Sequence, residues 1–148
     1  MNKVTGSILI IIFSISFISC GNSESQNQPE NHPPISTSTH GLELNNGKLW
    51  KANRETTEGV ESMIEIMSSF QKTNDLEAYS ELTEKLKNEF SLIFKNCTMT
   101  GAAHDQLHNF LIPIKDLLTT LSSSNISECQ ESYDQLFTQL KLYHNYFD

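Results

Sequence analysis

The sequence is short of basic residues, cysteine, glycine and proline. Ten Lys and Arg side chains stand against 18 Asp and Glu, which gives a formal net charge of -8 over 148 residues. So acidic a chain lacks the positive surface that a sequence-independent nucleic-acid binder needs, and we expect no nucleic-acid partner. Six Gly, four Pro and three Cys exclude collagen-like, mucin-like and disulfide-dense classes. The length allows one ordinary domain.

The N-terminal segment has the pattern of an export signal. Lys3 is followed by an apolar run from Ile8 to Ile18. A helix of that length rises about 16 Å, about half the hydrocarbon core of a bilayer, so the run is too short to span a membrane stably. Its length and flanks are typical of a secretory signal peptide, which predicts that residues 1–19 are removed.

The apolar run ends in a motif that resembles the lipobox of bacterial lipoproteins, with Phe17 three positions before Cys20 and Ser19 directly before it. Phe17 replaces the more usual Leu. The resemblance implies cleavage before Cys20 and attachment of palmitate-like acyl chains, and two or more such chains anchor a protein stably where one does not. We therefore expect a lipoprotein of the cell envelope, anchored to the outer (or inner) membrane with its domain outside the cytoplasm. The alternative is an ordinary signal peptide cut near Ser19, or an uncleaved helix.

Residues 20–41 have almost nothing to bury. They contain Pro29, Pro33 and Pro34 among many Ser, Thr, Asn and Gln side chains. Such a composition cannot offset the entropy of ordering the chain and predicts a lipidated, disordered linker. Residues 42–148 carry all of the patterned hydrophobicity and are expected to form one domain.

Four amphipathic segments in this domain predict helices, because apolar side chains recur in each at spacings of three and four. Short connections between four such helices predict an all-α fold, an antiparallel up-down four-helix bundle. An expected turn at residues 45–47 and an irregular lead-in that packs Trp50 on the domain precede them. The expected helices run from about Thr57 to Gln71, from Asn74-Asp75 to Cys97, from after Gly101 to Leu121 and from Ser127 to Phe147.

Polar residues near the starts of these segments predict helix caps. A short side chain with an oxygen accepts a hydrogen bond from the free N–H groups of the first turn, and a nearby Glu or Gln can complete a capping box. The predicted caps are Thr56 or Thr57 for the first helix, Asn74-Asp75 with Glu77 for the second and Ser127 with Gln130 for the fourth.

An up-down bundle brings the start of its first and third helices and the end of its second and fourth to one pole. His104 and His108, spaced i and i+4, face the same way about 6 Å apart, close enough to bind one metal ion. Cys97 and Met99 add soft sulfur ligands, which suit Cu(I). The residues expected at this pole are Trp50, Asn53, Met63, Cys97, Met99, His104, His108 and His144.

The sequence therefore predicts a transition-metal site, for copper or zinc, at His104, His108, Met99 and Cys97. In the alternative interpretation, Cys97 and Met99 cap the core while the two histidines bond to carboxylates or carbonyls. Either way the histidines are expected to flank the apolar stripe of the third helix and to stay outside the core.

Met63 and His144 support a third interpretation. A methionine on the first helix and a histidine on the core stripe of the last resemble the Met/His haem ligation of four-helix b-type cytochromes. The sequence has no C-x-x-C-H motif for covalent haem attachment. Residues of these types on packed stripes are also ordinary core residues.

Cys97 and Cys129 remain once Cys20 is lipidated, and an oxidising envelope favours a disulfide between them. A straight third helix of about 18 residues would instead separate them by about 27 Å, whereas a disulfide needs Cα atoms within about 7 Å. A kink is expected at Pro113. Either the third helix breaks there and folds back, or the thiols are unpaired.

Catalytic motifs are missing from the sequence. It has no glycine-rich phosphate loop and no nucleophile elbow. Cys97 and His104 could form a thiolate pair, but no orienting acid or oxyanion element accompanies them. We therefore expect a non-catalytic binding protein and no enzyme; the alternative is a structural or partner-binding module without a ligand.

Two stretches, Asn46–Asn53 and Cys97–Gly101, together with His104 and His108, resemble a group of small Bacteroidetes-type helical lipoproteins. The similarity covers residues 42–148. It implies an envelope location and a helical fold, and it implies no mechanism because the group has no assigned activity.

Overall fold

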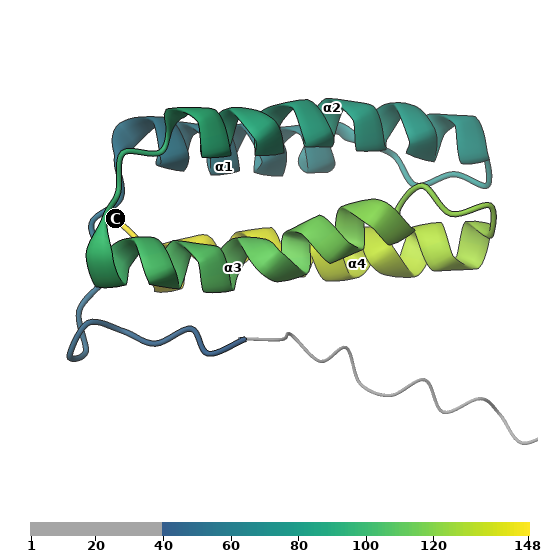
Figure 1. Cartoon of the computed structure of the whole chain (residues 1–148). Coiled ribbons are helices and arrows are strands. Elements are labelled where there is room, and N and C mark those ends of the chain that lie inside the picture. The colour runs from purple at the N-terminus through teal and green to yellow at the C-terminus, as the bar shows by residue number, and fades with distance from the viewer. Residues whose placement is uncertain (1–39) are drawn as a thin grey trace, which may run out of the picture. The chain divides into compact units, whose positions relative to one another are not determined.

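The computed structural model describes residues 40–148, so the predicted signal peptide, Cys20 and nearly all of the predicted linker lie outside the described residues. The described part is an all-α four-helix bundle, which confirms the predicted fold class (Figure 1). A single 3₁₀ turn, Tyr143–Asn145, follows the last helix. The helices are α1 (Arg54–Ser69), α2 (Leu76–Asn96), α3 (Gly101–Thr120) and α4 (Ile126–Lys141).

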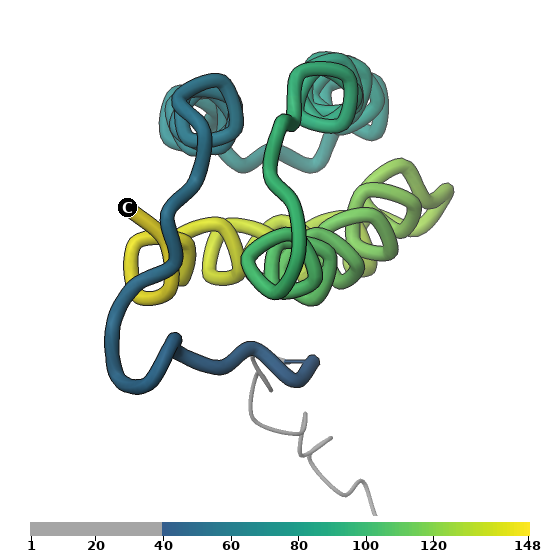
Figure 2. The backbone as a smooth tube through the Cα atoms, turned by 60° about the vertical axis from the view of Figure 1, so that its left-hand side comes forward, coloured from purple at the N-terminus to yellow at the C-terminus, as the bar shows by residue number. Residues whose placement is uncertain are grey.

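Successive helices alternate in direction, as Figure 1 shows, so the α2–α3 connection and the C-terminus lie at one end of the bundle. The α1–α2 and α3–α4 connections lie at the other end. Packing is closest within the pairs α1–α2 and α3–α4, and these pairs form the two layers seen in Figure 2. Contact between α2 and α3 is much smaller, which leaves room for a surface pocket between them.

The apolar stripes explain the core. Each of the four helices buries the residues that recur at spacings of three and four, and full burial of one such side chain contributes about 1.5–3 kcal/mol. Gly59 lets α1 and α2 approach, because a Cβ atom there would lie 2.6 Å from Ile93 Cγ1. The fully buried side chains of the core include Met63, Leu86, Ile93, Phe110, Leu136 and Tyr143.

The lead-in before α1 packs along α3 instead of leaving the domain. The Asn109 side chain donates to the Gly41 carbonyl at 3.2 Å, and the Glu43 N–H donates to the Gln106 side chain at 2.8 Å. Leu42 between them is buried. The described end of the predicted linker is therefore already fixed to the surface of the bundle.

The predicted packing of Trp50 on the domain is confirmed. Its indole N–H donates to the Glu43 carbonyl at 2.6 Å, and its backbone pairs with the C-terminal segment through Tyr146 and Asp148. The expected turn is formed by reciprocal hydrogen bonds between Asn45 and Lys48. The first and last parts of the domain are thus joined by backbone hydrogen bonds.

Two of the predicted caps are wrong, and in both cases an earlier asparagine takes the position. Helix α1 begins after Asn53, ahead of the predicted Thr56 or Thr57. Helix α4 begins after Asn125, whose side chain accepts a hydrogen bond from the Ser127 N–H, so Ser127 is not the cap. Asp75 caps α2 as predicted, its side chain accepting from the Glu77 N–H, but the Glu77 side chain does not complete the predicted capping box.

The two cysteines of the described residues, Cys97 and Cys129, are free, so of the two alternatives that the sequence left open the unpaired thiols hold and the possible disulfide is not formed. Helix α3 continues through Pro113 without a break. Twenty helical residues rise about 30 Å, which keeps the end of α2 and the start of α4 at opposite ends of the bundle (Figure 1). Among residues 40–148, no helix has both the length and the apolar character needed to cross a membrane.

Candidate metal centre

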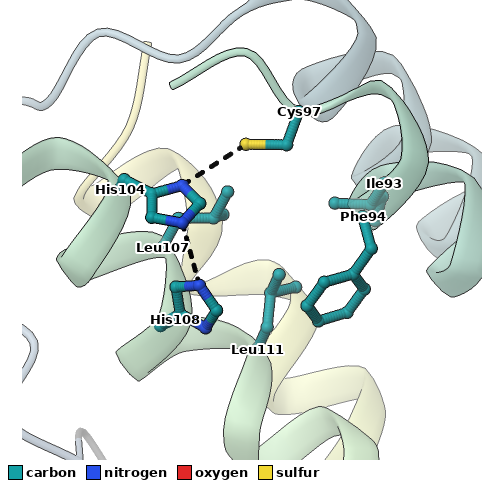
Figure 3. A pocket seen from close by; sticks show the side chains of 7 residues that line it. All are labelled: Ile93, Phe94, Cys97, His104, Leu107, His108 and Leu111. Carbon is teal, nitrogen blue, oxygen red and sulfur yellow. Dashed lines mark hydrogen bonds between the residues drawn. The ribbon is translucent and has the colours of Figure 1, made fainter. Parts of the chain in front are cut away.

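Cys97, His104 and His108 meet at the α2–α3 connection (Figure 3). Cys97 is the C-cap residue directly after α2, and the two histidines are one turn apart in the first half of α3. The Cys97 Sγ atom lies 3.6 Å from His104 Nδ1, and His104 Nε2 lies 3.0 Å from His108 Nε2. The three side chains therefore form one row with the His104 ring in the middle.

Asn53 fixes the backbone of the connection that carries Cys97. Its amide nitrogen donates to the Asn96 carbonyl at 3.1 Å, and its oxygen accepts from the Thr98 N–H at 3.3 Å. Gly101 then starts α3 with φ +61, a left-handed conformation that favours glycine. The Asn53 hydrogen bonds and the Gly101 conformation thus fix the turn between α2 and α3, and the turn fixes the position of the Cys97 thiol.

A pocket of about 70 Å³ between α2 and α3 borders the row. Cys97 and His104 are half-buried at its edge, whereas His108 is exposed. The Phe94 ring packs edge-on to the His108 ring, with centroids 6.2 Å apart. One side of the row therefore faces apolar walls and the other faces solvent. The lining residues are Ile93, Phe94, Cys97, His104, Leu107, His108 and Leu111.

Either neutral tautomer of His104 satisfies both contacts of its ring. A neutral imidazole has one N–H donor and one acceptor nitrogen. With the proton on Nε2, His104 donates to His108 Nε2 and accepts a hydrogen bond from the Cys97 thiol at Nδ1; with the proton on Nδ1, both directions are reversed. Without a metal, the row is a short chain of hydrogen bonds that begins at a thiol.

The four predicted ligands do not converge on one point. In the part of the chain that the structure describes, no three His, Cys, Asp or Glu side chains are arranged to hold a metal ion. Met99 is half-buried and packs against the core, and Cys97 and His108 contact different nitrogens of His104. What the fold assembles is two adjacent donor pairs that share His104.

Met63 and His144 are not brought together as haem ligands. Met63 is fully buried in the core. The His144 side chain is 54% exposed, and its Nε2 lies 3.9 Å from Glu61 Oε1. The shallow pocket beside His144 is lined by Glu61, Ile64, Glu65 and Lys141, and not by Met63. The helix ends before His144, so this residue leaves the core stripe on which it was expected.

Phe94 is the site residue that sequence reasoning missed. It lies outside the apolar stripe of α2, with its side chain 48% exposed, and an exposed phenylalanine gives no signal of its own. Its spacing of three from Cys97 does place both side chains on one side of the helix.

No protein family, curated protein or solved structure matches this chain.

Proposed function

We propose that this chain is a lipid-anchored protein of the cell envelope whose helical domain binds a transition-metal ion, copper or zinc, without catalysing a reaction. The observation that supports binding is the row at the α2–α3 connection, where a thiol and two imidazoles from residues up to 11 positions apart lie within 3.6 Å of their neighbours. Sulfur and imidazole donors together suit copper and zinc and suit Mg²⁺ or Ca²⁺ poorly.

The position of the row also favours binding. His104 is anchored by neighbours on both ring nitrogens, so little side-chain freedom is lost when it takes a ligand. The pocket beside it has apolar walls, which lower the local dielectric and strengthen electrostatic attraction. His108 is exposed and gives an ion a path from solvent.

The anchor rests on the sequence alone, through Phe17, Ser19 and Cys20. Mass spectrometry of the membrane-extracted protein tests it: we expect a mature chain that begins at Cys20 and carries acyl chains. A Cys20→Ser variant is expected to leave the membrane fraction. A mature chain that begins elsewhere and carries no lipid would contradict the anchor.

Metal binding is tested on the full chain, extracted in detergent and kept reduced under anaerobic conditions. Zn²⁺ or Cu⁺ is titrated against a chelator of known affinity. We expect one ion per chain and loss of that stoichiometric binding in His104→Ala, with His144→Ala as a control that removes a histidine outside the site. Absence of stoichiometric binding by the unmodified chain at about 10 μM would contradict the proposal, since physiological sites bind more tightly than that.

The alternative, a partner-binding module without a ligand, draws on two apolar side chains next to the same row. Phe94 and Ile112 are 48% and 46% exposed, and Ile112 follows His108 by one turn of α3. Large exposed apolar groups at one site are typical of a protein contact. A chain that fails to bind either ion would favour this alternative.

A further inference from the structure

His104 offers its two ring nitrogens to different partners. Nδ1 faces Cys97 Sγ, and Nε2 faces His108 Nε2. The lone pairs of these nitrogens diverge in the plane of the ring, so one ion cannot use both contacts. The row therefore contains two mutually exclusive two-donor sites: a thiol–imidazole pair and an imidazole–imidazole pair.

The two distances distinguish between these sites. A tetrahedral Zn²⁺ lies about 2.3 Å from a thiolate sulfur and about 2.05 Å from an imidazole nitrogen, which places those two donors about 3.6 Å apart. Cys97 Sγ and His104 Nδ1 are 3.6 Å apart. Two imidazole nitrogens on the same ion would lie about 3.4 Å apart, whereas the two Nε2 atoms are 3.0 Å apart. The thiol–imidazole pair already has the required spacing, and the imidazole pair would have to open.

The surroundings favour the same pair. Cys97 and His104 are half-buried against the apolar pocket, while His108 is exposed. A metal-binding histidine usually gives its other ring N–H to an acceptor, which fixes its tautomer and orientation. His108 Nε2, 3.0 Å from His104 Nε2, is placed to be that acceptor (Figure 3).

We propose that a thiophilic d¹⁰ ion, Zn²⁺ or Cu⁺, binds between Cys97 Sγ and His104 Nδ1, and that His108 is a positioning residue and not a ligand. This inference rests on the proposed function. On binding, the Cys97 S–H bond breaks, its proton goes to solvent and the metal–sulfur bond forms, with no change of oxidation state. The remaining coordination positions face solvent and the pocket, where water or an external ligand completes the shell.

The test compares variants of the full, detergent-extracted chain in chelator competition with Zn²⁺ and with Cu⁺. We expect Cys97→Ser, Cys97→Ala and His104→Ala each to weaken binding more than about 100-fold, above the roughly 10–100-fold cost of losing an outer-shell partner. His108→Ala should weaken it about 10-fold, the usual cost of losing an outer partner, and His108→Gln should recover most of that because its oxygen can accept the hydrogen bond. Cys129→Ala, which removes the other free thiol of the described residues, should bind like the unmodified chain.

The outcomes separate the two proposals. If His108→Ala abolishes binding and Cys97→Ser does not, the ion uses the imidazole pair; the proposed function then stands and this inference fails. If the unmodified chain binds neither ion, both fail. Circular dichroism and thermal unfolding of each variant confirm that the bundle is intact, and the paired Cys97 substitutions guard against an effect specific to serine. The zinc and copper titrations identify which of the two ions the site prefers.

Discussion

Cys97 and Cys129 lie at opposite ends of one four-helix bundle, and the two thiols have different surroundings. Cys97 is half-buried beside a pocket, with an imidazole nitrogen 3.6 Å from its sulfur. Cys129 is fully buried, donates to the Ser123 carbonyl at 3.2 Å, and burial raises the pKa of its thiol. We call the first end, which contains Cys97, His104 and His108, the site pole, and the end that contains Cys129 the closed pole.

The closed pole uses its polar groups to hold the bundle together. The Gln130 side chain donates to the Thr73 carbonyl, and the Tyr133 hydroxyl donates to the Met67 carbonyl at 2.7 Å. These bonds join α4 to α1 and to the α1–α2 connection. At the site pole, by contrast, the histidines contact each other and a thiol, and no carboxylate lies within hydrogen-bond distance of His104 or His108 among residues 40–148. The comparison teaches that the polar side chains beside Cys129 bond to the backbone of neighbouring elements, whereas His104 and His108 contact each other and a thiol and stay available to a ligand.

Thiol labelling should give the largest difference between the poles. In the native chain, we expect a small maleimide to modify Cys97 at least about 100-fold faster than Cys129, because a fully buried thiol reacts only after local opening. Timed labelling followed by peptide mass spectrometry measures both rates in one sample. In denaturant the two modification rates should converge. Equal rates in the native chain would contradict the claim that Cys97 is accessible and Cys129 is not.

Two tyrosines at the closed pole should respond differently to loss of the hydroxyl. Tyr133→Phe removes the buried hydrogen bond to Met67 and is expected to lower the free energy of unfolding by about 1 kcal/mol. Tyr79→Phe should leave it unchanged or raise it slightly, because the buried Tyr79 hydroxyl has no hydrogen-bond partner in the described residues. Urea unfolding of both variants measures this. Equal destabilisation would show that the hydrogen bond contributes nothing beyond packing.

Alkaline pH should destabilise the bundle, in part through three groups of the closed pole; burial also raises the pKa of Tyr143, near the site pole. Burial raises the pKa of Cys129, Tyr79 and Tyr133, so the folded state holds these protons more tightly than the unfolded chain. Their contribution is complete below the unfolded values, about 8.5 for a thiol and 10 for a phenol, and is lost as the pH rises past them. Thermal unfolding from pH 7 to 11 should show a falling Tm from about pH 8.5, less steep in Cys129→Ala. A Tm that rises over this range would contradict the assignment.

Removing His108 should have the smallest effect on stability. The side chain is exposed and its polar contact is with His104, so His108→Ala should change the free energy of unfolding by less than about 0.5 kcal/mol. The same urea experiment serves as the measurement. A loss comparable to that of Tyr133→Phe would mean that the site pole, too, is built for stability.

The fold could be predicted because its determinants are local and repeated. The spacing of Val60, Met63 and Met67 identifies the buried face of α1 without reference to any other helix. Helix starts were less predictable, since Asn53 and Asn125 compete with nearby Thr and Ser residues for the same position. The choice depends on tertiary contacts: Asn53 also bonds to the α2–α3 connection.

The candidate site could be predicted in part. The i, i+4 spacing of His104 and His108 indicates that the rings are neighbours, and the up-down topology brings Cys97 near them. The direction of each ring nitrogen, and the packing of half-buried Met99 against the core, depend on side-chain rotamers and on the α2–α3 packing. Sequence spacing does not carry that information. The sequence therefore predicted one site with four ligands, whereas the structure has two donor pairs that share His104.

The central claim is that sulfur from Cys97 is in the coordination shell of the bound ion. X-ray absorption spectroscopy of the metal-loaded full chain measures this directly. We predict one sulfur scatterer at about 2.3 Å together with an imidazole nitrogen at about 2.0–2.1 Å for zinc, and loss of the sulfur signal in Cys97→Ser. A shell of nitrogen and oxygen alone in the unmodified chain would contradict the account.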